Sequence, residues 1–221
     1  MPARALPMPF LSLFVSRRFL PLLVLAFGCG KAPVARAPEP PAPGPSPASE
    51  FSSSSWETLA LSEQPVELAL PAAGGWQQTR SGSFGVLHDA RSRSTLVIRV
   101  WRAARLVHPA ECEAEARLAR PSLAVVDSST LIEERELGAP TGFHGVLRVA
   151  AMPAEVGEVK GVVVAVGAAV GRCVIATFET RSDGKHAAET VADRLSAIVA
   201  GTFDTLRIVE VEERVLNTPR G

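Results

Sequence analysis

The chain has 221 residues, and 23 basic residues balance 23 acidic residues, so the formal net charge is zero. Nucleic-acid binding needs clustered lysine and arginine, and the longest basic patch beyond the N-terminal region is the segment 91–93, so no nucleic-acid partner is expected. The chain has three tryptophans and no tyrosine, which argues against an aromatic platform for carbohydrates. Its length suits a single domain with a hydrophobic core.

The N-terminal region has the parts of a bacterial export signal. Arg17 and Arg18 precede a ten-residue apolar run, 19–28, which ends at Cys29. A membrane-spanning helix needs roughly 17 to 25 apolar residues. The shorter run therefore predicts a signal peptide over residues 1–28 that is cleaved rather than retained.

Residues 26–29, Ala-Phe-Gly-Cys, resemble the lipobox of bacterial lipoproteins. The resemblance implies that Cys29 is lipidated, for example with palmitate, and anchors the protein to a membrane without crossing it. Gly30 differs from the aspartate of an inner-membrane retention signal, which favours the outer membrane, facing the periplasm or the cell surface. Two alternatives remain open: an ordinary secretory signal that leaves Cys29 as a free thiol or disulfide partner, and the twin-arginine export route.

A proline-rich stretch follows the cysteine. From residue 32 to residue 49, seven of eighteen residues are proline, a composition that favours extended polyproline II and buries little apolar surface. At about 3.1 Å per residue it would reach roughly 55 Å. Residues 29–55 are therefore predicted to be a lipidated cysteine plus tether, with recognition by an aromatic-groove domain as the alternative.

The first half of the remaining chain predicts strands and one helix. Alternation over 66–70 before a proline predicts a short edge strand. The segments 84–88 and 95–102 flank a polar turn and predict a hairpin, whose second arm presents Leu96, Ile98 and Val100 to the core and Val97, Arg99 and Trp101 to the opposite face. Pro109, early glutamates and late arginines predict a helix over 109–120.

The second half predicts a meander followed by a helix. Strand patterns cover 130–137, 143–151, 158–168 and 172–180, and the joins between them are too short for crossover helices, so neighbouring strands should pair antiparallel. The run 162–166 is apolar on both faces, which indicates a central strand covered on both sides. The last helix is predicted from apolar residues at helical spacing, with Asp183 as its cap: Val191, Leu195, Ile198 and Thr202.

These elements predict an α+β fold: an antiparallel β-sheet of about six strands flanked by two main helices, an α/β sandwich. The single domain is placed at 56–211, with a weak strand over 206–211 and a flexible tail over 212–221. The layout across 66–203, ending in the helix with the sequence VADRLSAIVAGTF, resembles the PsbP-like family of extrinsic photosystem proteins and their bacterial relatives. That resemblance implies a small non-enzymatic module that docks on or helps assemble a membrane complex, and no site residue is carried over from it.

Two cysteines lie within the predicted domain, Cys112 and Cys173. Disulfides persist in exported proteins, so the two are predicted to pair. The alternative is a redox or metal pair, which the missing Cys-x-x-Cys spacing argues against.

No catalytic residues, metal site or cofactor are predicted. A speculative binding surface consists of Trp101, Arg99 and Arg102, in which packing of Trp101 under a helix is favoured over exposure. The predicted function is a lipid-anchored envelope module that binds or assembles with an envelope protein. The alternative is a periplasmic hydrolase or metal-dependent enzyme whose candidate residues converge only in three dimensions: His186, Glu189, His88 and His144.

Overall fold

The structure is a computed structural model, and it describes residues 51, 54–61, 64–72, 75–103, 108–137, 144–169 and 171–209. The predicted signal peptide, Cys29, most of the tether and the predicted tail lie outside these residues. The described strands are β1 (Trp56–Ala60), β2 (Val66–Pro71), β3 (Gln77–Ser81), β4 (Phe84–Asp89), β5 (Ser94–Arg102), β6 (Leu131–Leu137), β7 (His144–Pro153), β8 (Glu158–Ala169), β9 (Arg172–Asp183) and β10 (Arg207–Ile208). The helices are α2 (Pro109–Ala119) and α3 (Ala187–Ile198), and α3 runs into a π-helical turn, η1 (Val199–Phe203).

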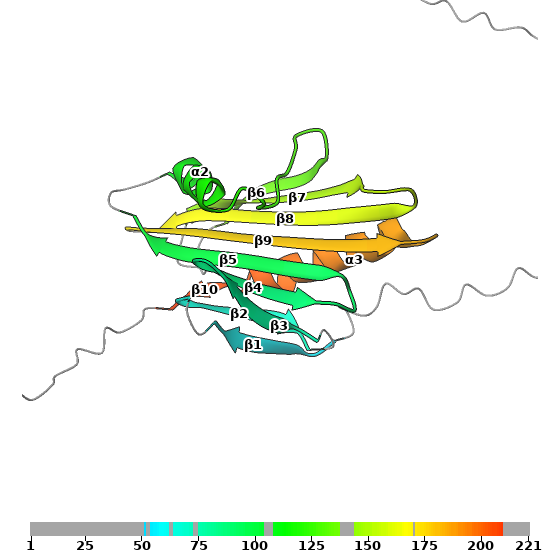
Figure 1. Ribbon diagram of the computed structural model, residues 1–221, viewed down its shortest axis with the longest axis horizontal. Coiled ribbons are helices and arrows are strands. Elements are labelled where there is room, and N and C mark those ends of the chain that lie inside the picture. Colours follow the sequence, from blue (N-terminus) through cyan, green and yellow to red (C-terminus); the bar gives the residue numbers. More distant parts are fainter. Residues whose placement is uncertain are drawn as a thin grey trace, which may run out of the picture. The chain divides into compact units, whose positions relative to one another are not determined.

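The described strands form two antiparallel sheets (Figure 1). The main sheet has seven strands in the order β3-β4-β5-β9-β8-β7-β6, and the smaller sheet has the order β1-β2-β10. The predicted fold class, α+β with an antiparallel sheet between two main helices, is confirmed. The separate smaller sheet was not predicted, and β2 is its middle strand rather than an edge strand.

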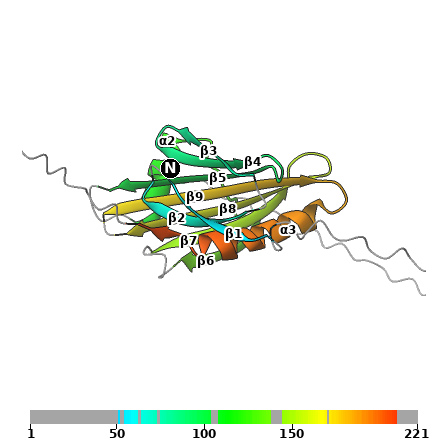
Figure 2. The ribbon, with the colours of Figure 1, turned by 90° about the horizontal axis from the view of Figure 1, so that it is seen from below.

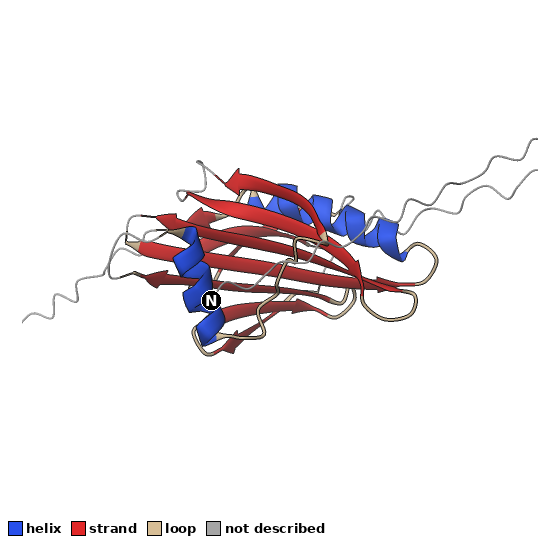
Figure 3. Ribbon diagram, turned by 90° about the horizontal axis from the view of Figure 1, so that it is seen from above, coloured by secondary structure: helices blue, strands red, loops and turns tan. Residues whose placement is uncertain are grey.

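The two helices cover opposite faces of the main sheet. Figure 2 shows α2 on one side of the long strands β5, β9 and β8, and α3 with β1 and β2 on the other. In Figure 3, α2 crosses the strands whereas α3 runs along them. The apolar run predicted to form a central strand belongs to β8, and its residues 162–166 are all at most 2 % exposed. The prediction of a strand covered on both faces is confirmed.

The α3 side contains the largest apolar core. Val191, Leu195 and Ile198 are at most 3 % exposed and lie in one cluster with Phe178 of β9. The smaller sheet adds its own inward-facing residues to the same cluster: Val66, Leu68 and Leu70. Gly161 of β8 permits the close approach of α3, since a Cβ there would lie 2.6 Å from Val191 Cγ1.

The α2 side is held differently. α2 buries only Cys112 and Ala116, and a disulfide joins Cys112 to Cys173 of β9, with a Cα–Cα distance of 5.5 Å. The helix starts with Pro at its first position and with Glu111 accepting a hydrogen bond from the His108 backbone N–H, 3.4 Å away. The proline has no backbone N–H that would need a partner, and Glu111 accepts from the backbone N–H of His108, so both features stabilise the first turn of the helix.

Some local predictions differ from the structure. Asp183 does not cap α3 but ends β9, and His186 is the N-cap residue, without a side-chain cap hydrogen bond. The reversal between β9 and α3 needs Gly184, whose φ of 86° lies in the left-handed region. Phe51, which falls within the predicted tether, is 3 % exposed and belongs to the α3-side core. Neither described helix has the length and apolar character that a membrane crossing requires.

Candidate functional site

Two arginines and two aromatic rings meet on the α2 side of the main sheet. The Arg99 guanidinium carbon lies 4.4 Å from the centre of the Trp101 ring and 5.4 Å from that of Phe84. The Arg120 guanidinium carbon lies 5.6 Å from the centre of the same Phe84 ring. We call these four residues, Phe84, Arg99, Trp101 and Arg120, the arginine–aromatic cluster. Aromatic faces attract guanidinium groups through the ring quadrupole, which explains the stacking.

The cluster contains buried N–H groups without a hydrogen-bond acceptor. Within the described part of the chain, these atoms are Arg99 Nε and Nη1, Trp101 Nε1 and Arg120 Nη1. One carboxylate stands at the edge: Glu115 Oε1 is 4.0 Å from Arg99 Nη2, and the Glu115 side chain is 53 % exposed. The cluster is therefore a partly desolvated concentration of positive charge, which has the chemistry to receive an anion.

The structure brings together two of the three residues of the predicted binding surface. Arg99 and Trp101 share the α2 face of β5, and Trp101 is half-buried against the apolar cluster below α2. Arg102 follows Trp101 in the strand, so strand alternation directs it to the opposite face. Sequence reasoning missed Phe84 and Arg120. The sequence identifies Arg120 only as a positive charge at the end of a helix. Its position in the chain gives no sign that it contacts Phe84 of β4.

A second feature is a groove of about 440 Å³ between β6 and the α3–η1 segment. Its lining combines aliphatic side chains with a few charges: Ile132, Glu133, Arg135, Val149, Ala192, Leu195, Ser196, Val199, Ala200 and Asp204. Arg135 bridges its rim by pairing with Glu133, 3.0 Å away, and with Asp204. The hydrogen bond with Asp204 raises the pKa of Arg135 above its ordinary value.

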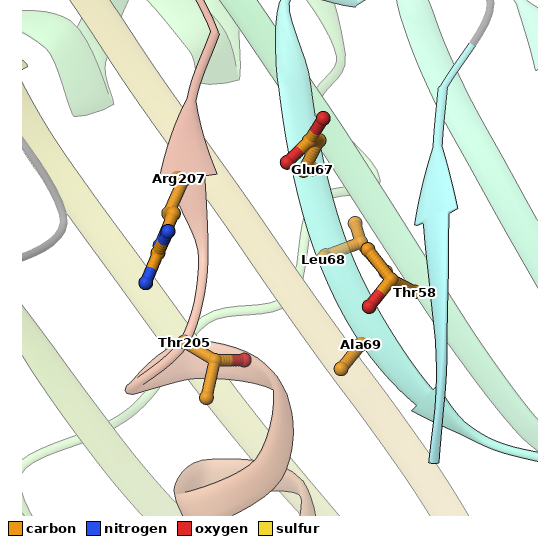
Figure 4. A pocket seen from close by; sticks show the side chains of 6 residues that line it. All are labelled: Thr58, Glu67, Leu68, Ala69, Thr205 and Arg207. Atoms are coloured by element: carbon orange, nitrogen blue, oxygen red, sulfur yellow. The ribbon is translucent and has the colours of Figure 1, made fainter.

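A third feature is a smaller pocket of about 340 Å³ on the smaller sheet (Figure 4). Arg207 of β10 and Glu67 of β2 are cross-strand partners there, and Thr58 and Thr205 complete the polar lining beside Leu68 and Ala69. The pocket carries one charge of each sign, and it offers less apolar wall than the groove beside β6.

Charged residues between α2 and β7 form a network that holds the helix in place. Glu113 accepts hydrogen bonds from Arg117, 2.7 Å away, and from Arg148, 3.0 Å away. Burial alone would raise the pKa of Glu113, but the hydrogen bonds from these two arginines hold it below its ordinary value. Arg148 also pairs with Glu134 of β6, at 3.1 Å. Glu113 is therefore held in its charged form by two arginines, and this pairing fixes α2 to β7.

The candidate residues of the enzyme alternative lie on three elements: His186 and Glu189 at the start of α3, His88 on β4 and His144 on β7. His186 Nδ1 lies 2.9 Å from Glu189 Oε2, and the two side chains are 48 % and 65 % exposed. His88 lies on β4, where its Nδ1 is 3.1 Å from Thr95 Oγ1, and His144 begins β7. Among the described residues, no group of three or more His, Cys, Asp or Glu side chains is arranged to hold a metal ion.

No protein-family model matches the chain, and no curated protein matches it. Its layout is similar to that of cyanobacterial PsbP (CyanoP) from Synechocystis, with 12 % identity and a TM-score of 0.43 over 70 % of this chain and 93 % of that one. It is also similar to LpqN of Mycobacterium tuberculosis, a protein involved in cell envelope biogenesis, with 13 % identity and a TM-score of 0.39 over 76 % and 100 % of the two chains. A third similar structure is a protein from Bacteroides thetaiotaomicron, with 10 % identity and a TM-score of 0.41. The similarity covers 71 % of this chain and 50 % of the Bacteroides chain. A PsbP-like protein is thus among the structures with which this chain shares some of its layout, at low sequence identity.

Proposed function

We propose that this protein is a lipid-anchored module of a bacterial cell envelope that acts by binding an envelope protein. In this proposal, the export signal directs the chain to the envelope, Cys29 carries the lipid anchor, and the proline-rich stretch is a spacer between lipid and domain. The described fold begins at Phe51, which is buried in the core. The spacer therefore leads directly into a folded unit that presents its surfaces to other envelope components.

The groove beside β6 is the observation that carries the binding proposal. β6 is an edge strand of the described main sheet, paired with β7. The opposite edge of a terminal strand offers backbone N–H and C=O groups to an added strand. Ile132, 66 % exposed, lies on β6 and also lines the groove. An extended peptide could thus pair with β6 while its apolar side chains enter the groove.

The charges of this edge select the partner's chemistry. Glu133 of β6 and Asp204 face each other across the groove, whereas Glu134 pairs with Arg148 on the α2 side. Arg135 pairs with both Glu133 and Asp204, so one positive charge stands against two negative charges and the groove lining is acidic overall. Complementary charge favours the correct partner and discourages others. The proposed partner is an extended apolar segment flanked by lysine or arginine.

A photo-crosslinking amino acid at position 132, in the full chain in its own cells, tests this proposal. Val156 is the matched control, because it is a fully exposed aliphatic residue in the turn between β7 and β8. We expect position 132 to capture one segment of one envelope protein, identified by mass spectrometry as apolar with basic flanks, and position 156 not to capture it. Equal capture at both positions, or an acidic captured segment, contradicts the proposal.

A charge reversal gives an independent readout. Glu133→Lys, in the groove lining, is expected to reduce capture at position 132 severalfold, whereas Glu155→Lys, the same change in the turn after β7, leaves capture unchanged. The anchor is tested separately by an intact mass of protein extracted from its own membranes. A chain that begins at acylated Cys29 supports the anchor, and an unacylated chain with another N-terminus contradicts it.

A further inference from the structure

The buried unpartnered donors of the described chain are concentrated in one place. Every buried side-chain nitrogen or oxygen without a hydrogen-bond partner, among the described residues, belongs to Arg99, Trp101 or Arg120. Leaving a buried donor unpaired is unfavourable, and more so for a charged group. Native proteins pair the great majority of such groups. Four unpaired nitrogens in one cluster therefore indicate an acceptor that the described chain does not supply.

The charge of the cluster points the same way. Two guanidinium groups share the Phe84 ring, and the Arg99 side chain is only 14 % exposed. The aromatic faces attract the cations but cannot accept hydrogen bonds in the guanidinium plane. Glu115, at 4.0 Å from Arg99, remains largely in solvent and balances one of the two charges only weakly. The cluster keeps a net positive charge in a partly desolvated place.

We infer that the arginine–aromatic cluster is a binding site for a phosphate-type oxyanion. Guanidinium groups match the geometry of phosphate oxygens, and a phosphate offers more acceptor oxygens than a carboxylate to donors from three side chains. The ligand enters at the edge marked by Glu115, whose carboxylate occupies the neighbouring position and competes with it. Arg99 and Arg120 hold the anion, and the Trp101 indole N–H donates to it.

The disulfide holds the helix that closes this site. Trp101 is the strand partner of Cys173 in the β5–β9 pairing, and Cys173 is bonded to Cys112 of α2. α2 also carries Glu115, and Arg120 follows directly after it. The covalent link therefore keeps Glu115 near Arg99 of β5 and Arg120 over Phe84 of β4.

The test is an NMR titration of the tryptophan indole N–H signals in the full chain, purified in a maltoside detergent that contains no phosphate. Inorganic phosphate is added against chloride at equal ionic strength and pH. We expect a saturable shift of the Trp101 signal, assigned with Trp101→Phe. The Trp76 signal is the internal control, because its Nε1 already donates to the Pro71 carbonyl at 3.1 Å. A Trp101 signal that does not respond, or responds equally to chloride, overturns the inference.

Variants distinguish a site from a general charge effect. Arg99→Gln and Arg120→Gln are each expected to weaken phosphate binding about tenfold or more, because each removes a charge-assisted donor. Arg91→Gln, at an exposed turn residue, is the matched control and leaves binding unchanged. Glu115→Gln removes the competing carboxylate and tightens binding about two- to threefold, whereas Glu155→Gln does not. Equal binding by Arg99→Gln and Arg91→Gln overturns the inference. An unchanged Trp76 signal in each variant shows that the fold is kept.

The source of the oxyanion is settled by a second titration. Phosphatidylglycerol added to the detergent micelles supplies the same phosphate chemistry as a lipid headgroup. A Trp101 shift at lipid levels far below the free-phosphate requirement assigns the site to a headgroup, and a shift with free phosphate alone assigns it to a soluble ligand. Both results support the oxyanion site, and this site lies apart from the groove beside β6, so its failure leaves the proposed function standing.

Discussion

The two faces of the main sheet are stabilised by different physical means. On the α3 face, apolar side chains from α3, the smaller sheet and the long strands form one large core. On the α2 face, two small apolar clusters, a disulfide and arginine-centred contacts hold the layer together. The leucines of the two helices show the contrast: Leu195 of α3 is 3 % exposed, whereas Leu118 of α2 is 84 % exposed.

The difference shows how a helix with little apolar surface stays on a sheet. Fully burying a large aliphatic side chain contributes about 1.5–3 kcal/mol, and α3 buries three: Val191, Leu195 and Ile198. α2 buries a cysteine and an alanine, so hydrophobic burial alone holds it weakly. The covalent link to β9 and the pairing of Glu113 with Arg148 replace that burial. The α2 layer is therefore held with little apolar burial and carries several charged groups between helix and sheet.

The largest expected effect is on the α2 face. Replacing Cys112 and Cys173 together with serine should lower the free energy of unfolding by roughly 4 kcal/mol, since the disulfide closes a loop of 61 residues in the unfolded chain. Urea unfolding followed by tryptophan fluorescence measures the change. Cys29→Ser is the control and should leave stability unchanged. A loss below about 1 kcal/mol would mean that noncovalent contacts hold α2 by themselves.

The comparison is sharpened by one substitution made on both helices. Leu195→Ala should lower the free energy of unfolding by about 3 kcal/mol, because it opens a cavity in the α3-side core. Leu118→Ala removes the same atoms from an exposed position and should change stability by less than about 0.5 kcal/mol. Thermal and urea unfolding of both variants give the values. Similar losses for the two variants would contradict the proposed difference between the faces.

The spacing of α3 from the sheet depends on Gly161. An alanine Cβ at this position would lie 2.6 Å from Val191 Cγ1 and 3.0 Å from Leu195 Cδ1. Gly161→Ala should therefore destabilise the fold by about 2 kcal/mol through overpacking. Gly75→Ala is the control, since nothing lies within 4 Å of its added Cβ. If Gly161→Ala unfolds at the wild-type urea concentration, the α3 layer is more adaptable than its burial indicates.

The smallest expected effect depends on pH and tests the ionic contribution to the α2 face. Glu113→Gln should lower the free energy of unfolding at pH 7 by about 1 kcal/mol. Because the folded-state pKa of Glu113 lies below its ordinary value of 4.5, its stabilisation is present above pH 4.5 and is lost as the pH falls through the folded-state pKa. The difference between wild type and variant should therefore shrink below pH 4.5. Glu134→Gln, which removes a more exposed partner of Arg148, should show little difference at any pH.

The sequence alone was enough to predict the elements whose side chains leave water in a regular pattern. The apolar run 162–166 has no polar face, which predicts a strand covered on both sides. Val191, Leu195 and Ile198 repeat at helical spacing and predict the inner face of α3. Cys112 and Cys173 were predicted to pair because an exported chain allows it, and the structure contains that disulfide. The first two patterns depend on residues close in the chain, and the third depends on the chemistry of two cysteines.

Polar strands and long-range meetings were decided by the tertiary structure. β3 has the sequence QQTRS and is exposed along its whole length, so its strand conformation comes from backbone pairing with β4, which leaves no hydrophobic pattern. Arg99 and Arg120 meet on Phe84 only because α2 crosses the main sheet over β8 and β9 and Arg120 follows directly after the helix. The groove beside β6 likewise depends on where α3 and η1 lie. Hydrophobic periodicity indicates which side chains are buried. Which residues become neighbours depends on the order of the strands and the direction of the helices. That arrangement is determined jointly by segments that lie far apart in the chain.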